Sequence, residues 1–283
     1  KLSMTVPLIY NYGTAIGSSE MCDFAVYNLM DKKKGQFKKP VPTIWKDIFR
    51  VLESLKYISP ITERVNQLNA EIAGGASLED CARKLRKAVP SVTWYPETEF
   101  CYIKNASDWF FAAKGGHNNE SHNHNDIGTF LLYKGSVPVF ADAGVGTYTK
   151  KTFSSERYTI WSMLSDWHNL PVINGKTQMN GGEYRSADVY VGSKGKTKVF
   201  RLDISGAYRD GTDCNSWVRE YAVSDKLLTI TDSYDLKKRN ASDVLNFVVQ
   251  GKVLLPGESA SCGYVVKSGE VVIENQGVAF RVA

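Results

Sequence analysis

Hydrophobic residues in the first ninety positions recur every three or four residues, which is the spacing of amphipathic helices. Ser residues that can cap a helix, and Gly or Pro residues that can end one, lie at most of the boundaries. The pattern predicts four helices, over Ser18 or Ser19 to Leu29, 43–58, Ser59 to Gly74, and Ser77 to Pro90. In the third helix, Ser59 is expected to be the N-cap and Pro60 the first helical residue. Residues 1–92 are therefore expected to form a helical segment.

From Val92 onward, apolar and polar residues alternate with a period of two, and Gly, Asn and Asp interrupt the alternation. The predicted strands lie at 99–104, 109–113, 128–133, 137–142, 199–204, 218–223, 227–233 and 244–249, with a final pair near 264–282. Many short strands separated by turn signals are typical of an antiparallel sandwich. The predicted fold class is therefore α+β, with helices over 1–92 and a large antiparallel β-sandwich over 93–283.

The composition is that of an ordinary globular protein, with 43% apolar and 23% charged residues among 283. No stretch is long and apolar enough for a membrane span. The formal net charge is +5, but the basic runs Lys32–Lys34 and Lys237–Arg239 are short and are interpreted as solvated turns. Neither a membrane nor a nucleic-acid partner is expected. Five cysteines lie far apart without a C-x-x-C motif, which argues against a disulfide framework.

Three of the four histidines, His117, His122 and His124, lie within eight positions, and the fourth is His168. Neutral imidazole is a common metal ligand, and its pKa near neutrality also suits acid/base catalysis. In an extended strand, residues two apart point to one face, so His122 and His124 are expected to converge on one object while Asn123 points away. This cluster is the main candidate for the functional site.

A metal would need further ligands, and Asp142 and His168 are the candidates. With His124 they form a set of two nitrogens and one oxygen, which suits Zn²⁺ and leaves a fourth position open. Asp142 could instead begin a turn before Ala-Gly, and His168 could be a half-buried histidine bonded to the backbone. A tight turn at Gly135-Ser136 would pair Asp142 with Thr129, roughly 16 Å along the strand from His124. The histidine segment must then fold back over the sheet.

Three motifs in this region resemble the heparinase II/III-like family of polysaccharide lyases. They are Gly115–Gly128, with the sequence GGHNNESHNHNDIG, Val139–Tyr148, with VFADAGVGTY, and Trp167–Gly175, with WHNLPVING. The resemblance implies an N-terminal α/α toroid joined to a C-terminal antiparallel β-sandwich of the supersandwich type. Residues 1–90 would then be the last part of the toroid or the link to it.

The resemblance also implies the roles of individual residues. The first His of the His-x-His motif, His122, is implied as a catalytic acid/base residue, and His124, Asp142 and His168 are implied to bind a structural zinc ion. The family's other catalytic residues, a tyrosine and an asparagine or histidine, lie in the toroid and have no match in residues 1–90. The sequence therefore leaves open whether this piece is active alone.

The implied reaction is β-elimination next to a uronic acid in an acidic polysaccharide. A base removes the C5 proton, an acid protonates the departing O4, and the carboxylate must be neutralised. The candidate substrate-binding residues are Asn119, Glu120, Asn123, Tyr148 and Arg157. Amides can bond a carboxylate or hydroxyls, Arg can pair with uronate, and aromatic rings stack on sugars. Glu120 is equally consistent with orienting an imidazole or lying in water, and Tyr148 and Arg157 could belong to the core or rim.

Two other classes of function compete with a lyase. One is a metal-braced sandwich that binds carbohydrate without cleaving it. The other is a zinc hydrolase that activates water at the open ligand position, but no H-E-x-x-H motif is present, so it ranks last. The chain begins without Met or an apolar signal region, so we expect that it is processed or is a piece of a longer protein. The resemblance and the bulky substrate imply a periplasmic or secreted protein, and a homodimer is one option for its assembly.

Overall fold

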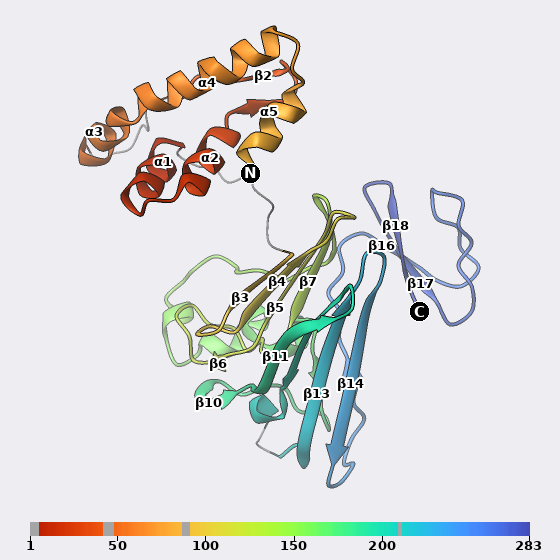
Figure 1. Ribbon diagram of the computed structural model, residues 1–283. Coiled ribbons are helices and arrows are strands. Elements are labelled where there is room, and N and C mark those ends of the chain that lie inside the picture. Colours follow the sequence, from red (N-terminus) through yellow and green to blue (C-terminus); the bar gives the residue numbers. More distant parts are fainter. Residues whose placement is uncertain (1–5, 42–47, 87–90, 209–210) are drawn as a thin grey trace. The chain divides into compact units, whose positions relative to one another are not determined.

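A computed structural model describes residues 6–41, 48–86, 91–208 and 211–283 of the chain (Figure 1). The chain divides into two compact units, residues 1–89 and 90–283, each with its own hydrophobic core. The first unit is mainly helical, and the strands of the second pair in antiparallel sheets. The predicted α+β class is correct at this level. No helix in the described ranges is long and apolar enough to cross a membrane.

The helical unit follows the predicted apolar spacing. Its elements are α1 (Val6–Ala15), α2 (Ser19–Tyr27), β1 (Met30–Asp31), β2 (Gln36–Phe37), α3 (Ile48–Lys56), α4 (Ile58–Ala73) and α5 (Leu78–Leu85). In α4, the buried residues Ile61, Val65 and Leu68 form one stripe along the helix, as the pattern predicts. Ser18 and Ser77 cap α2 and α5, because each hydroxyl accepts a hydrogen bond from a backbone N–H three residues later.

Two details of the helical prediction change. The helix α4 begins at Ile58 after Tyr57, so Ser59 is not its N-cap, and Ser59 and Pro60 lie within its first turn. Pro is tolerated there because the first turn has no intrahelical partner for its N–H groups. The helix predicted over 43–58 ends at Lys56, because Ile58 already belongs to α4, and its first residues, 43–47, lie outside the described ranges. Pro90, the expected end of the last helix, also lies outside them.

Two sheets build most of the second unit. The first has the order β3 (Val92–Tyr95), β4 (Phe100–Lys104), β5 (Trp109–Lys114), β7 (Phe130–Lys134), β8 (Val137–Phe140). The second has the order β11 (Ala187–Lys194), β12 (Thr197–Asp203), β13 (Cys214–Val223), β14 (Leu228–Leu236). Both contribute to one core, in which Tyr221 of β13 lies 5.1 Å from Phe111 of β5 and 5.3 Å from Phe130 of β7, measured between ring centroids. The shared core places the sheets face to face.

Smaller pairings connect the long loops to these sheets. They are β6 (His117–Asn118) with β10 (Gly181–Arg185), β9 (Pro171–Val172) with β15 (Val244–Leu245), and a three-stranded sheet of β16 (Lys252–Leu254), β17 (Val271–Asn275) and β18 (Val278–Val282). The strand predicted over 244–249 is therefore only two residues long.

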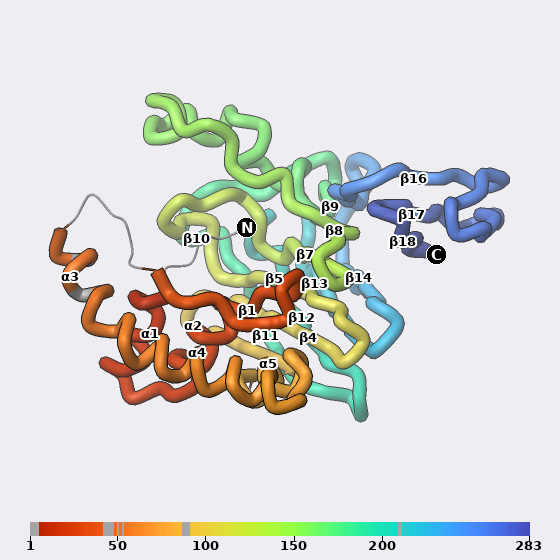
Figure 2. The backbone as a smooth tube through the Cα atoms, turned by 90° about the horizontal axis from the view of Figure 1, so that it is seen from above, coloured from red at the N-terminus to blue at the C-terminus, as the bar shows by residue number. Residues whose placement is uncertain are grey.

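Between β8 and β9 the chain forms four short 3-10 helices, η1 (Lys151–Phe153), η2 (Arg157–Thr159), η3 (Trp161–Met163) and η4 (Ser165–Trp167). This green segment projects beyond the sheets in Figure 2.

Candidate functional site

The segment that carries the clustered histidines is a series of turns, so the expected extended strand is wrong. Only His117–Asn118 form a strand, and His122 has a φ of 60°, in the left-handed region. Because the backbone turns at His122, the two histidines of the His-x-His motif point to different places. His122 is exposed, whereas His124 is only 8% exposed. They do not converge on one object.

The segment does fold back over the sheet, as the separation of Asp142 from His124 requires. Gly128 has a φ of 83°, and a Cβ at this position would lie 2.7 Å from Cγ2 of Ile204, so only glycine fits the turn. The turn is closed by a hydrogen bond from Thr129 N to Asp126 O, 3.1 Å long. The Asp126 carboxylate also pairs with Lys114 Nζ at 2.8 Å, and both side chains are largely buried.

Gln178 is buried and joins this segment to the neighbouring loops. Its Oε1 accepts hydrogen bonds from Asn118 Nδ2, at 3.1 Å, and from Ile127 N, at 3.0 Å. Its Nε2 donates to Ile127 O at 2.7 Å, and its backbone carbonyl accepts from Asn125 Nδ2. No feature of the local sequence marked Gln178, because these three partners lie more than fifty residues away. Such a buried network fixes the backbone on both sides of His122 and His124.

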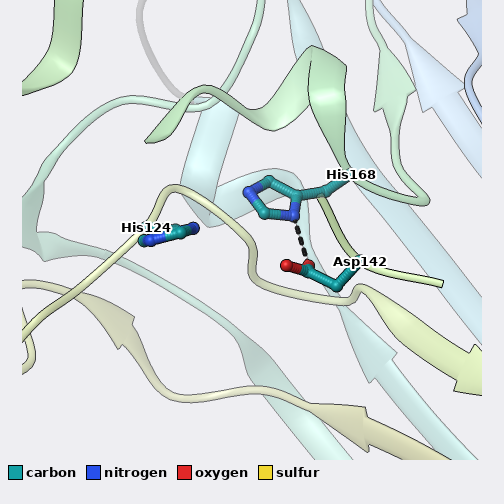
Figure 3. A group of neighbouring side chains, drawn as sticks. All are labelled: His124, Asp142 and His168. Carbon is teal, nitrogen blue, oxygen red and sulfur yellow. Dashed lines mark hydrogen bonds and ion pairs between the residues drawn. The ribbon is translucent and has the colours of Figure 1, made fainter. Parts of the chain in front are cut away.

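His124, Asp142 and His168 come together, as predicted. One potential ligand atom from each lies within 4.8 Å of the other two. Asp142 lies in the loop after β8, and His168 directly follows η4 and is fully buried. Nδ1 of His168 lies 2.7 Å from Oδ2 of Asp142, and Figure 3 shows one ring nitrogen of His124 directed at this pair. The other carboxylate oxygen, Asp142 Oδ1, accepts a hydrogen bond from Gly144 N at 2.6 Å, so the turn interpretation of Asp142 is also correct.

The charges of the three groups depend on one another. Burial alone would raise the pKa of the Asp142 carboxyl, but the hydrogen bond and positive charge of His168 outweigh it and lower that pKa. Burial likewise would lower the pKa of His168, but its bond to Asp142 raises it. For His124 burial dominates and lowers the pKa, which favours the neutral imidazole. Asp142 is thus an anion, and His124 offers a nitrogen lone pair.

These residues fit a divalent metal ion. The buried Nε2 atoms of His124 and His168 have no hydrogen-bond partner among the described residues. Buried polar atoms are normally paired, and in their neutral forms these two imidazoles can each offer a nitrogen lone pair to a cation beside the carboxylate. Two nitrogens and an oxygen are ligands that Zn²⁺ accepts. The donor set and its burial are therefore compatible with a metal site at the three residues that the sequence suggested.

Asn169, next to His168, fixes the two loops that supply Asp142 and His168. Its Nδ2 donates to Phe130 O at 2.7 Å and to Ala141 O at 2.9 Å, and its Oδ1 accepts from Val248 N at 2.7 Å. Its own carbonyl accepts from Arg219 Nη1, a buried guanidinium that also pairs with Asp232. The sequence contained a signal for Asn169, since it lies inside the motif that supplies His168, but its partners could not be read from it.

The exposed edge of the site is formed by His122 and Tyr148. The Nδ1 atom of His122 lies 3.2 Å from the Tyr148 hydroxyl, and the two rings meet edge to face with centroids 5.7 Å apart. Tyr148 in turn stacks on Phe153, which is exposed, with centroids 5.6 Å apart. One predicted catalytic residue and one predicted substrate-binding residue therefore lie side by side on the surface.

The other predicted substrate-binding residues divide into two groups. Arg157 donates to the Asn123 carbonyl from Nε, at 3.1 Å, and Nη2, at 2.7 Å, and to Thr152 O from Nη1. Asn123 is buried, and its Nδ2 donates to the Tyr158 hydroxyl. Arg157 and Asn123 thus join the projecting loop to the histidine segment. Asn119 is exposed and Glu120 is half-buried, which leaves both accessible at this edge.

The family model described as heparinase II/III-like, C-terminal, matches residues 88–277, which is most of the second unit. Two solved structures resemble the fold of the chain. A heparinase III with methylated lysines is 13% identical with a TM-score of 0.53, and another crystal structure of heparinase III is 14% identical with the same TM-score. Each alignment covers 96% of this chain but only 42% or 43% of the other. No curated protein sequence matches the chain significantly.

Proposed function

The chain belongs to the heparinase II/III-like family through its C-terminal domain, and on this premise we propose that it is part of a polysaccharide lyase. The lyase would cleave polymers that contain uronic acids, by β-elimination. In this proposal, residues 90–283 form the C-terminal supersandwich and residues 1–89 the end of the toroid. The single observation that carries the proposal is an exposed imidazole, His122, held two residues from a buried cluster of potential metal ligands.

We assign the proton transfer to His122. The reaction needs a base for the C5 proton and an acid for the departing O4, and an imidazole near neutrality can serve as either. Since Nδ1 of His122 interacts with the Tyr148 hydroxyl, Nε2 is the atom that would exchange a proton with the sugar. The contact with the Tyr148 hydroxyl holds the ring in one orientation, which a proton transfer requires.

The neighbouring polar residues would bind the polymer. As the C5 proton leaves, negative charge spreads onto the uronate carboxylate, which must be stabilised by hydrogen-bond donors. The exposed Asn119 amide can donate without adding negative charge, and Glu120 can accept from a sugar hydroxyl or orient an imidazole. Asn123 and Arg157 already form hydrogen bonds within the protein. We propose that they hold the residues at this edge in place and so act on polymer binding indirectly.

We propose that His124, Asp142 and His168 hold a zinc ion with a structural role. The ion would supply the positive charge that the Asp142 carboxylate otherwise obtains from His168, and it would join the histidine segment to the loops after β8 and η4. These three residues thereby fix the backbone at His124. Because His122 is only two residues away, the same cluster determines where its imidazole lies.

The test is an elimination assay of the longer protein that contains this chain. Heparan sulfate, hyaluronan and alginate are suitable polymers, because each contains uronate residues. A lyase releases unsaturated uronates that absorb ultraviolet light, and absorbance should rise with time for at least one polymer. Binding without any product would favour the carbohydrate-binding alternative. Saturated products, lost on chelation, would instead favour a zinc hydrolase and refute the lyase.

Partner and location follow from the same proposal. The partner is an acidic polysaccharide, which is too bulky to enter a cell, so we propose that the protein acts in the periplasm or after secretion. We also propose a homodimer, which sedimentation of the longer protein would test.

A further inference from the structure

A cleft lies at the edge of the four-stranded sheet, between β13 and β14 on one side and residues 239–245 on the other. Its volume is about 820 Å³. The residues that carry its chemistry are Trp217, Asp232, Tyr234, Arg239, Ser242 and Asp243. It shares no residue with the histidine site, and it includes part of the basic run Lys237–Arg239, which the sequence alone suggested was a solvated turn.

The floor of the cleft is a rigid aromatic platform. The rings of Tyr234 and Trp217 are nearly parallel, at 11°, with centroids 4.5 Å apart. Trp217 is buried and donates from Nε1 to Asp232 Oδ1 at 2.9 Å, and Arg219 holds the same carboxylate through two bonds. Tyr234 is nevertheless 48% exposed. One face of its ring is therefore covered and fixed, while the remainder is accessible to a flat ligand.

A guanidinium lies at the rim of this platform. Nη2 of Arg239 is 3.3 Å from the Tyr234 hydroxyl and 3.1 Å from Oδ2 of Asp243. The Arg239 side chain is 60% exposed, so its pair with Asp243 contributes little to stability, and an anionic ligand can compete for the guanidinium. Arg binds carboxylate and sulfate groups with paired hydrogen bonds, which makes this rim suited to an acidic sugar.

Asn174 fixes the opposite wall. It lies in the same motif as His168, is buried, and has a φ of 48°. Its Nδ2 donates to Lys238 O at 2.7 Å, its Oδ1 accepts from Asn240 N at 2.9 Å, and its backbone N donates to Asp243 Oδ1 at 2.9 Å. Lys237–Arg239 are exposed, as the solvated-turn interpretation expects, and these bonds fix the backbone of the wall. Because these bonds already order the wall, little free energy of binding would be spent on ordering it when a ligand binds.

We propose that this cleft is a second saccharide-binding site, where a sugar ring stacks on Tyr234 and its carboxylate or sulfate pairs with Arg239. The aromatic platform stands on the geometry alone, whereas the choice of an acidic sugar rests on the proposed function. Bound here, one stretch of a polymer would raise the local concentration of other stretches at His122. The site would thus retain the polymer between cleavage events.

The test is the affinity of the chain for oligosaccharides of heparan sulfate, hyaluronan and alginate, measured by calorimetry. Tyr234→Ala and Arg239→Gln should each weaken binding about tenfold, the scale of one aromatic or charge-assisted contact. Tyr190→Ala is the matched control, since Tyr190 is also exposed and also lies beside an arginine, with Arg201 5.4 Å from its ring, but outside the cleft. Unchanged melting temperatures would show that the variants fold.

Other outcomes would overturn the proposal in distinguishable ways. Wild-type affinity in Tyr234→Ala, or affinity lost only in His122→Ala, would leave the histidine site as the binding site and remove the second one. An uncharged oligosaccharide that binds as tightly as the acidic ones would refute the choice of ligand. No binding by the chain to any of the three would also refute the second site. The elimination assay of the longer protein would still decide the proposed function by itself.

Discussion

The two histidines of the His-x-His motif are two residues apart, yet they occupy opposite environments. His124 faces inward toward Asp142 and His168, whereas His122 is exposed beside Tyr148. The left-handed turn at His122 separates them, since it interrupts the alternation that an extended strand would impose. The difference shows that one short segment can place a buried side chain and an exposed side chain only two residues apart. In the proposed function the buried histidine anchors the backbone, while the exposed one is accessible to the substrate.

The largest effect that distinguishes the two histidines is expected from removing the exposed imidazole of His122. In the longer protein, His122→Ala should lower the rate of elimination by about 10²- to 10⁴-fold, the usual contribution of a general acid or base. Its melting temperature should not change, because His122 is exposed. Elimination followed by ultraviolet absorbance, together with thermal unfolding, measures both. His117→Ala is the control from the same segment, and an equal loss of rate in that variant would contradict the assignment.

Removing a buried histidine of the cluster should instead lower the free energy of unfolding. His168→Ala leaves Asp142 without its partner in a mostly buried position, which should cost about 3 kcal/mol in the free energy of unfolding. His124→Ala should also lower stability, and both variants should lose bound zinc. Chemical denaturation and metal analysis of the purified chain provide the measurements. If His122→Ala destabilised the chain as much as these two, the separation of roles would be wrong.

Metal removal should affect only the buried region. With zinc at one hundred times its dissociation constant, the folded chain should gain about 2.7 kcal/mol, and a chelator should remove this gain. In His168→Ala, chelator and zinc should leave the melting temperature unchanged. If neither zinc nor the chelator changed the melting temperature of the wild-type chain, a structural zinc ion would be ruled out. Denaturation at several zinc concentrations gives the result.

The smallest expected effect lies within the exposed region. Tyr148→Phe keeps the ring that stacks on Phe153 but removes the hydroxyl beside His122. Loss of one hydrogen bond of about 0.5–1.5 kcal/mol should lower kcat/KM roughly two- to tenfold. An unchanged kcat/KM would mean that Tyr148 does not orient His122.

Much of the secondary structure could be predicted from the sequence, because the spacing of apolar residues indicates which face of a helix or strand is buried. The stripe of Ile61, Val65 and Leu68 has the period of a helix, and the alternation from Trp217 to Val223 has the period of a strand. The residues of the buried cluster were also named from the sequence, through residue type and through the motifs that carry the family resemblance. Residue type and spacing are properties of the chain alone.

Tertiary contacts decided the rest. The turn at Gly128 depends on Ile204, the partners of Arg157 are carbonyls of Asn123 and Thr152, and the wall of the second cleft depends on Asn174 more than sixty residues away. Ser59 likewise is not the cap of α4, because the helix starts two residues earlier than expected. The sequence by itself determined which groups could perform chemistry. Which of them are buried and which are exposed was decided only when distant segments packed together, because burial depends on neighbours that local spacing does not specify.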